Sequence, residues 1–340
     1  MLLPHPLRAE AQDAQGTLDA DESVLFFPAI GWAQGDGAIM VNVDAWVFQQ
    51  ERQRVLDFAL AAYLDIDYDK LPPERRALLE QRVRYFHVDS ERNETIHVRI
   101  GSEVLTLPKT NPSGRAHGAF LVKRDLAQWR ADGVGRVVYT LQAPGHALHG
   151  QTGHAWILPE EGIFVVSDID DTIKHSSVLD RKALLRNTFL EPFQAVPGMA
   201  AWYREMAAGD AQVFFHYLSA SPLALHPALS GFLAENGFPQ GRLHLRESTS
   251  WRTLYADAKG NTAHKTSVLE RLAEKFPKRK FILIGDSGER DPEIYADFTR
   301  KHPERVLAIH IRNVTGEDKT APRYQATFTG IAPEQWRIRD

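Results

Sequence analysis

The second half of the chain alternates short apolar runs with amphipathic stretches. Residues 163–166 are four consecutive apolar residues preceded by Pro159 and Gly162, which predicts a short strand buried on both faces. Strands and helices that alternate along the chain are typical of a parallel sheet covered by helices, so we expect a doubly wound α/β domain here. The further strands are expected at 212–218, 243–246, 281–285 and 305–311, and the helices at 197–208, 222–236, 263–276 and 292–300.

The first half of the chain follows a different pattern. Residues 24–32 and 38–48 are rich in Val, Ile, Phe and Trp and flank a turn sequence at 33–37, which predicts a hairpin. From Tyr85 to Pro159, short alternating segments are separated by Gly, Pro and Asn. This spacing indicates a mainly antiparallel, sandwich-like β structure.

Two stretches inside this first half have helical rather than strand spacing. Residues 51–64 carry apolar side chains at helical intervals, and Pro72-Pro73 opens a second amphipathic stretch to about Arg84. The acidic segment between them, residues 65–70, lacks the Gly and Glu of a calcium loop, so we interpret it as a solvated connection. The expected organisation is a loose N-terminal arm at 1–23, a β-rich domain with a helical pair at 24–160, and an α/β domain at 161–340.

Composition narrows the classes of function. Lys and Arg total 40 against 44 Asp and Glu, a net charge of −4, so no global positive field favours a nucleic-acid partner. There is no Cys, which excludes disulfides, thiolate metal sites and a Cys nucleophile. No segment has the ~18 to 20 consecutive apolar residues that a membrane span needs. Two prolines interrupt the N-terminus, so we expect a cytoplasmic protein, with export left open if the chain starts upstream.

The strand at 163–166 leads directly into a cluster of carboxylates. Asp168, Asp170 and Asp171 follow it within four positions, at the strand end where open α/β sheets bind ligands. Carboxylates crowded in this way repel one another unless a cation or protonation compensates, which favours a divalent metal. A calcium loop is excluded because Ile173 occupies the position that requires Gly.

Other strand ends offer complementary chemistry. Ser219 and Ser221 lie where a strand meets a helix, a position that suits phosphate binding or simple helix capping. Lys265 is expected in the first turn of a helix capped near residues 261–262, where its charge requires a nearby anion. Asp286 ends a second wholly apolar strand, so it can share a metal with Asp168 at one sheet edge. A set of oxygen ligands suits Mg²⁺.

These segments resemble a known family. Asp168, Asp170, Ser219, Lys265, Asp286 and Asp291 occur in the order of the haloacid dehalogenase motifs. The segments that narrow the resemblance are SDIDDTIK (167–174), VPGM (196–199), YLSASP (217–222), HKT (264–266) and IGDSGERDPEIY (284–295). Over about residues 160–315 they look like the actin-patch-protein type of Mg²⁺-dependent phosphatidate phosphatase, which is distantly similar to lipins.

The resemblance implies a haloacid dehalogenase-like fold and a covalent mechanism. Asp168 would attack phosphorus to form an aspartyl-phosphate, and Asp170 would act as acid and then base. Mg²⁺ would bind Asp168, Asp286 and the main-chain carbonyl of Asp170. Ser219 and Lys265 would hold the phosphoryl oxygens, and the supporting residues would be Asp291, Thr172 and Lys174.

The substrate that the resemblance implies is a phosphorylated lipid. The segment between Ile173 and the second strand is too short for a large lid domain, and an open site of this kind suits a headgroup presented at a membrane surface. Trp251, Leu254 and Tyr255 are candidates for contact with that surface, with buried packing as the alternative. Two other functions stay open at this point. One is a soluble phosphomonoesterase for a small organic phosphate, and the other is a non-catalytic module that binds lipid or a partner.

Overall fold

The computed structural model describes residues 18–34, 37–51, 55–130, 133–209, 212–255 and 258–340. The chain splits into two compact units. Unit 1 comprises Met1–Arg52 with His87–Glu160, and unit 2 comprises Gln53–Phe86 with Glu161–Asp340. The loose arm expected at 1–23 lies outside the described residues up to residue 17, and its last two residues already belong to strand β1.

Unit 1 is built from β-strands, as the alternating pattern of the first half predicts. Its described strands are joined by hydrogen bonds into one ten-stranded sheet, mostly antiparallel, with β2 and β10 pairing in parallel. Its elements are β1 (Glu22–Phe27), β2 (Ala29–Gln34), β3 (Ala38–Gln50), β4 (Val88–Ser90), β5 (His97–Ile100), β6 (Glu103–Thr106), β7 (Arg115–Lys123), the 3₁₀ turn η3 (Arg124–Leu126), β8 (Gln128–Trp129), β9 (Gly135–Leu141) and β10 (Thr152–Leu158).

The expected hairpin at 24–48 forms, but its first arm is two strands rather than one. Pro28 has no backbone N–H, so the strand is interrupted there. β1 pairs with the second half of β3, β2 pairs with the first half of β3, and β2 then continues to β10. Alternate side chains of β3 and β9, such as Val43 and Tyr139, are buried in one common core.

The helical pair belongs to unit 2, whereas the sequence pattern suggested an insertion in the β-rich domain. It consists of α1 (Val55–Tyr63), η1 (Tyr68–Lys70), α2 (Pro73–Val83) and η2 (Arg84–Phe86). Arg82 of α2 is buried and donates hydrogen bonds to the carbonyl oxygens of Thr188, at 2.5 Å, and Glu191, at 2.7 Å. Its guanidinium also lies 3.6 Å from the ring centroid of Phe193. Long-range partners of this kind determine where an insertion packs, and adjacency along the chain does not reveal them.

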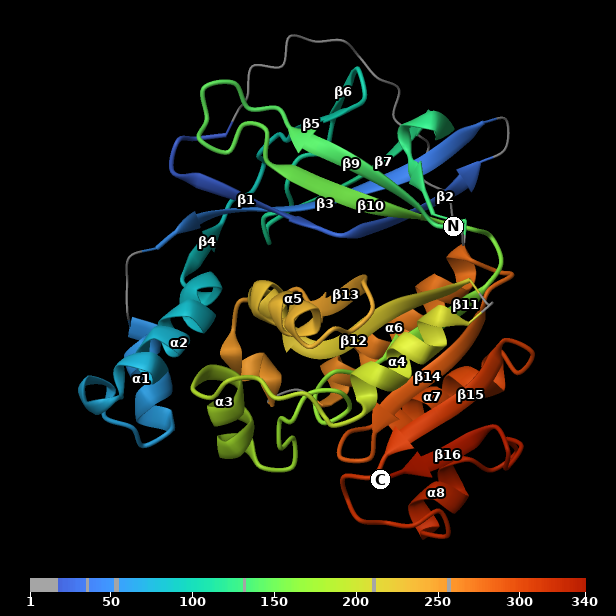
Figure 1. The fold of residues 1–340 in the computed structure, drawn as a ribbon. Coiled ribbons are helices and arrows are strands. Elements are labelled where there is room, and N and C mark those ends of the chain that lie inside the picture. The colour runs from blue at the N-terminus through green and yellow to red at the C-terminus, as the bar shows by residue number, and fades with distance from the viewer. Residues whose placement is uncertain (1–17, 35–36, 52–54, 131–132, 210–211, 256–257) are drawn as a thin grey trace. The chain divides into compact units, whose positions relative to one another are not determined.

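Unit 2 contains a six-stranded, wholly parallel sheet in the order β13-β12-β11-β14-β15-β16 (Figure 1). The strands are β11 (Ile163–Ser167), β12 (Val213–Pro222), β13 (Gly241–Arg246), β14 (Lys280–Asp286), β15 (Val306–Arg312) and β16 (Trp336–Arg339). The helices are α3 (Arg181–Phe189), α4 (Met199–Ala208), α5 (His226–Glu235) after η4 (Leu223–Leu225), α6 (Ala258–Lys275) after η5 (Trp251–Leu254), α7 (Asp291–Lys301) and α8 (Pro322–Thr327). The sequence pattern missed α3, α8 and β16, and it predicted the other strands and helices of this sheet.

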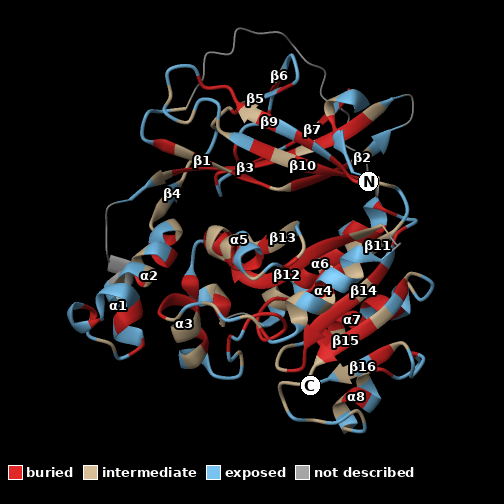
Figure 2. Cartoon of the chain, in the orientation of Figure 1, coloured by how far each residue is buried: buried red, intermediate tan, exposed pale blue. Residues whose placement is uncertain are grey.

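The position of β11 in the sheet locates the ligand-binding edge. Along the chain, β12 and β13 are added on one side of β11, and β14, β15 and β16 are added on its other side. The strand order therefore reverses between β11 and β14. Open α/β sheets bind ligands at such a reversal, beyond the carboxyl ends of the strands. Phe164, Val165 and Val166 of β11 are fully buried, which agrees with a strand covered on both faces (Figure 2). In the described part of the chain, none of the helices combines the length and apolar character that crossing a bilayer requires.

Candidate active site

The register of β11 and β14 brings two acidic residues to the same sheet edge. Ser167 lies opposite Ile284, and the N–H of Asp168 donates to the carbonyl oxygen of Ile284 at 2.8 Å. Asp286 follows two residues after Ile284. Asp168 and Asp286 are almost completely buried, with 1% and 0% of their surfaces exposed. The strand reversal therefore carries two buried carboxyl groups, as the two apolar runs predict.

Two contacts orient the Asp168 carboxylate. The Thr172 hydroxyl donates to Oδ2 at 3.0 Å, and the Lys265 ammonium lies 2.8 Å from Oδ1. Burial raises the pKa of Asp168 well above its ordinary value, and Lys265 opposes that effect without cancelling it. The carboxylates of Asp291, Glu289 and Asp286 raise the pKa further. Asp168 thus occupies a site with more negative charge than its own cation neutralises.

Lys265 lies among three carboxylates. Its ammonium is 2.5 Å from Asp291, 2.8 Å from Asp168 and 2.9 Å from Glu289, and the side chain is 1% exposed. Burial lowers the pKa of Lys265, but the carboxylates raise it well above its ordinary value, which keeps the ammonium charged. The predicted position in a first helical turn is wrong, because α6 begins at Ala258. The anionic partners that its charge requires are present.

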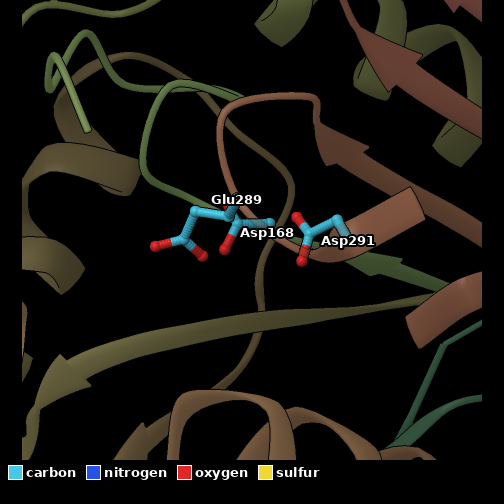
Figure 3. A group of neighbouring side chains, drawn as sticks. All are labelled: Asp168, Glu289 and Asp291. Carbon is cyan, nitrogen blue, oxygen red and sulfur yellow. The ribbon is translucent and has the colours of Figure 1, made fainter. Parts of the chain in front are cut away.

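Asp168, Glu289 and Asp291 form one group that has the composition of a metal site. Each offers a carboxylate oxygen, and these oxygens lie within 4.8 Å of one another (Figure 3). Lys265 already neutralises part of this charge. Glu289 lies in the segment 284–295 that carries the family resemblance, but the sequence analysis did not assign it a role. Its place between Asp286 and Asp291, in the loop after β14, was the available signal.

Asp286 provides a second indication of a cation. Its Oδ1 accepts from the N–H groups of Gly288, at 2.6 Å, and Glu289, at 3.1 Å. Its Oδ2 is buried and has no hydrogen-bond partner among the described residues. Burial raises the pKa of Asp286, and Asp291 and Glu289 raise it further. An unpaired, buried carboxylate oxygen is costly, and a hard cation with oxygen ligands would satisfy it.

Asp170 has a different environment from Asp168. Its Oδ1 lies 2.8 Å from the Lys174 ammonium and accepts from Ser176, while its Oδ2 accepts from the hydroxyls of Ser219, at 3.0 Å, and Ser221, at 3.1 Å. Burial raises the pKa of Asp170, but the charge of Lys174 and these hydrogen bonds outweigh burial and lower the pKa to about 2. The resting Asp170 is therefore an ionised carboxylate, and its neighbouring ammonium and hydroxyl groups stabilise the negative charge.

Ser219 and Ser221 do not cap the helix that follows them. β12 runs on through both residues to Pro222, and their side chains point to Asp170. No side-chain hydrogen bond caps η4 or α5. Ser219 was expected to hold a phosphoryl group, and in this structure its hydroxyl is donated to a carboxylate. Ser221, which the sequence analysis named beside Ser219, reaches the same carboxylate oxygen because residues two apart in a strand face the same side.

Asp171, the third acidic residue of the loop, has a structural role. Its backbone is left-handed, with a φ of 54°, and its carboxylate accepts the N–H groups of Ser176, Ser177 and Val178 at 2.6 to 3.0 Å. Arg312 donates to its carbonyl oxygen at 2.6 Å. These bonds hold the loop between Asp168 and α3. The carboxylate of Asp171 is therefore used within the loop, unlike those of Asp168 and Asp170.

A cavity of about 620 Å³ opens beside this cluster. Lys265 and Glu289 line it together with apolar side chains such as Leu179, Leu254 and Ile294. Trp251 and Leu254, which the sequence offered as surface contacts, are only 5% and 8% exposed, so their buried alternative is confirmed. The charged residues that also line the cavity are Arg181, Arg290, Arg323 and Glu293. A cavity of this size, lined by both apolar and charged side chains, suits a small organic ligand or part of a larger one.

Comparison with known proteins agrees with this geometry. Residues 163–313 match the family described as "Phosphatidate phosphatase APP1, catalytic domain". This segment is similar to that catalytic-domain family. The match contains all of the site residues described above, from Asp168 to Asp291, and it confirms the resemblance that the motifs suggested.

Two relatives show how far the similarity extends. The chain is 27% identical over 325 residues, 91% of its length, to Phosphatidate phosphatase APP1 of Saccharomyces cerevisiae, and this alignment covers 51% of the yeast protein. It is 34% identical over 182 residues, 52% of its length, to Uncharacterized protein C29B5.04c of Schizosaccharomyces pombe, covering 29% of that protein. The chain thus spans about half of the first relative and less of the second. The alignment with the yeast protein extends beyond the catalytic domain into the β-rich half.

Proposed function

We propose that the chain is a Mg²⁺-dependent phosphatidate phosphatase with a haloacid dehalogenase-like catalytic domain. It would hydrolyse phosphatidate to diacylglycerol and phosphate through an aspartyl-phosphate. The observation that carries the proposal is the position of Asp168, at the strand reversal of a segment that matches the APP1 catalytic domain. The strand order of the parallel sheet and the acidic cluster support it.

The donor set fits Mg²⁺. Asp168, Asp286 with its unpaired Oδ2, and the main-chain carbonyl of Asp170 would hold the ion. When bound, Mg²⁺ neutralises the negative charge that otherwise keeps a phosphate and a carboxylate apart. The group of Asp168, Glu289 and Asp291 shares only Asp168 with this ligand set, and its other two carboxylates contact Lys265.

Asp168 is the proposed nucleophile. One of its carboxylate oxygens would form a bond to phosphorus while the bond from phosphorus to the glycerol oxygen breaks. Thr172 and Lys265 act as positioning residues, because their contacts with the two carboxylate oxygens fix the plane of the group. Water would then attack the aspartyl-phosphate at phosphorus, which releases inorganic phosphate and restores the Asp168 carboxylate.

Asp170 is the proposed acid and base. Its low pKa leaves it ionised in the resting site, so it must take up a proton before it can act as the acid. After it has given that proton to the glycerol oxygen, it is a carboxylate again and can accept a proton from the attacking water. An incoming phosphoryl anion raises the pKa of Asp170 by charge repulsion and competes for the hydroxyl of Ser219. Both effects favour a protonated Asp170, which can then protonate the departing glycerol oxygen.

The test is phosphate release from phosphatidate vesicles in the presence of Mg²⁺. We expect release by the wild-type protein, and none above buffer in EDTA or with Asp168→Asn. Activity that survives either treatment would refute the mechanism. Equal rates with vesicles and with a water-soluble phosphomonoester would favour the soluble phosphatase, and no release from any substrate would favour a binding module.

A further inference from the structure

Leu179 is an apolar side chain that the fold holds in solvent. It is 63% exposed and lines the cavity beside Lys265. The chain on both sides of it is fixed: Asp171 accepts the N–H of Val178, and Asp180 caps α3 by accepting the N–H groups of Lys182 and Ala183. Because backbone hydrogen bonds hold this turn, the exposure of Leu179 is a built feature of the structure.

An aromatic cluster continues the same surface. Tyr255 lines the cavity, and its ring stacks on that of Tyr63 of α1 at 5.9 Å between centroids. Tyr63 is 36% exposed and also contacts Trp251 at 5.3 Å. Tyrosine rings at the edge of an apolar surface are typical of positions at a lipid–water interface. We call Tyr63, Leu179, Arg181 and Tyr255 the rim of the cavity.

The charge of the rim, and of the cavity lining away from the Lys265 cluster, is positive. Arg181 lies over the ring of Tyr255 at 5.4 Å. Away from the cluster of Lys265 and its three carboxylates, the cavity lining carries three cations, Arg181, Arg290 and Arg323, against one carboxylate, Glu293. Glu293 is paired with Arg323. Two acidic residues lie close in sequence to the rim, and both have partners: Asp180 accepts hydrogen bonds from the first turn of α3, and Asp65 pairs with Lys182.

We propose that the rim docks unit 2 on an anionic lipid bilayer, with Leu179 inserted among the acyl chains and Arg181 facing the headgroups. This inference rests on the proposed function and adds the surface through which a lipid substrate would reach the cavity. Exposed apolar and aromatic groups beside cations bind anionic interfaces by burial and by charge together. The two contributions can be separated, because salt screens only the second.

The experiment measures co-sedimentation of the full chain with phosphatidylcholine vesicles that contain phosphatidylserine, in EDTA and without phosphatidate. We expect Leu179→Ser to weaken binding about tenfold at every salt concentration, since it removes one inserted side chain. Arg181→Gln weakens binding about fivefold at low salt, and the difference disappears at high salt. Leu179→Trp strengthens binding about fivefold.

Leu307→Ser is the matched control. Leu307 is 47% exposed and lies near the start of β15, at the opposite end of the sheet from the site. We expect its vesicle binding to equal that of the wild type. Wild-type protein that does not sediment with the vesicles, or Leu179 and Arg181 variants that bind as the wild type does, would overturn the proposal.

The same proteins separate this inference from the proposed function. Phosphate release by the wild type with no effect of the rim variants on vesicle binding would sink the docking surface alone. Vesicle binding that depends on Leu179 and Arg181, without phosphate release from phosphatidate, would sink the phosphatase and leave the docking surface in place.

Discussion

Asp168 and Asp170 are two residues apart on one loop, both are buried, and each has a buried lysine within 2.8 Å. Their pKa values nevertheless move in opposite directions. Burial raises the pKa of Asp168 well above its usual range, whereas for Asp170 the effect of burial is outweighed by its partners and the pKa falls to about 2. Burial alone therefore does not determine the charge of a carboxyl group.

The difference lies in how the two lysines are shared. Lys265 faces three carboxylates, so its charge is divided among them. Lys174 forms an ion pair with Asp170, which also accepts hydroxyl hydrogen bonds on both oxygens. The negative charge of Asp170 is thus stabilised by its own partners, whereas that of Asp168 is only partly compensated by Lys265. The proposed nucleophile would receive the missing positive charge from the metal ion, whereas the pKa of the proposed acid and base must first rise toward neutral pH before it can carry a proton.

The largest expected difference is in catalysis. Asp168→Asn removes the proposed nucleophile and should lower the rate of phosphate release about 10⁵-fold or more, while Asp170→Asn removes the proton carrier and should lower it about 10³-fold. Phosphate release from phosphatidate vesicles measures both. Asp297→Asn makes the same chemical change at an exposed position and should leave the rate unaltered. Equal losses in the two site variants would contradict the separate roles.

Stability should rank the two sites in the reverse order. Lys174→Met leaves the Asp170 charge buried without its cation, which should lower the free energy of unfolding by about 3 to 5 kcal/mol. Asp168→Asn removes a charge from a site that has too many and should not lower it. Urea denaturation in EDTA measures both values. A larger loss in Asp168→Asn than in Lys174→Met would show that the comparison is wrong.

A smaller effect concerns the hydroxyl groups around Asp170. Ser221→Ala removes one hydrogen bond to a buried charged oxygen, which should lower the free energy of unfolding by about 1.5 to 3 kcal/mol. The exposed Ser267→Ala is the control and should change stability by less than about 0.5 kcal/mol. A neutral Ser221→Ala, measured by urea denaturation, would mean that Ser221 contributes little to the charge of Asp170.

The smallest effect is a dependence on pH. Burial raises the pKa of Asp291 to about 6, against an ordinary value of 3.8, so between these values the folded protein binds more protons than the unfolded chain. Metal-free wild type should therefore gain stability relative to Asp291→Asn as pH falls from 7 to 5, by about 1.4 kcal/mol per pH unit at most. Urea denaturation in EDTA across this range tests the sign. A difference that grows with rising pH would contradict the raised pKa.

Local sequence patterns predicted much of the candidate site. The apolar runs before Asp168 and Asp286 predicted two strands of one parallel sheet, and the carboxylates at their ends were found from position alone. That the two strands are neighbours comes from the structure. The place of Lys265 in its helix was wrong, because α6 begins at Ala258, upstream of the residues that resemble caps. Glu289 was missed because the sequence gives no measure of which loop side chains reach an ammonium group.

By itself, the sequence determined five of the six strands of the parallel sheet and the acidic residues that follow β11 and β14, because an apolar run followed by polar residues is a local signal that does not depend on the rest of the fold. Only the tertiary structure decided which charge meets which. Lys265 joins Asp168 across nearly a hundred residues, and the helical pair at 53–86 belongs to the unit formed by the far half of the chain. Electrostatic and packing energies depend on distances in space, which sequence spacing does not encode.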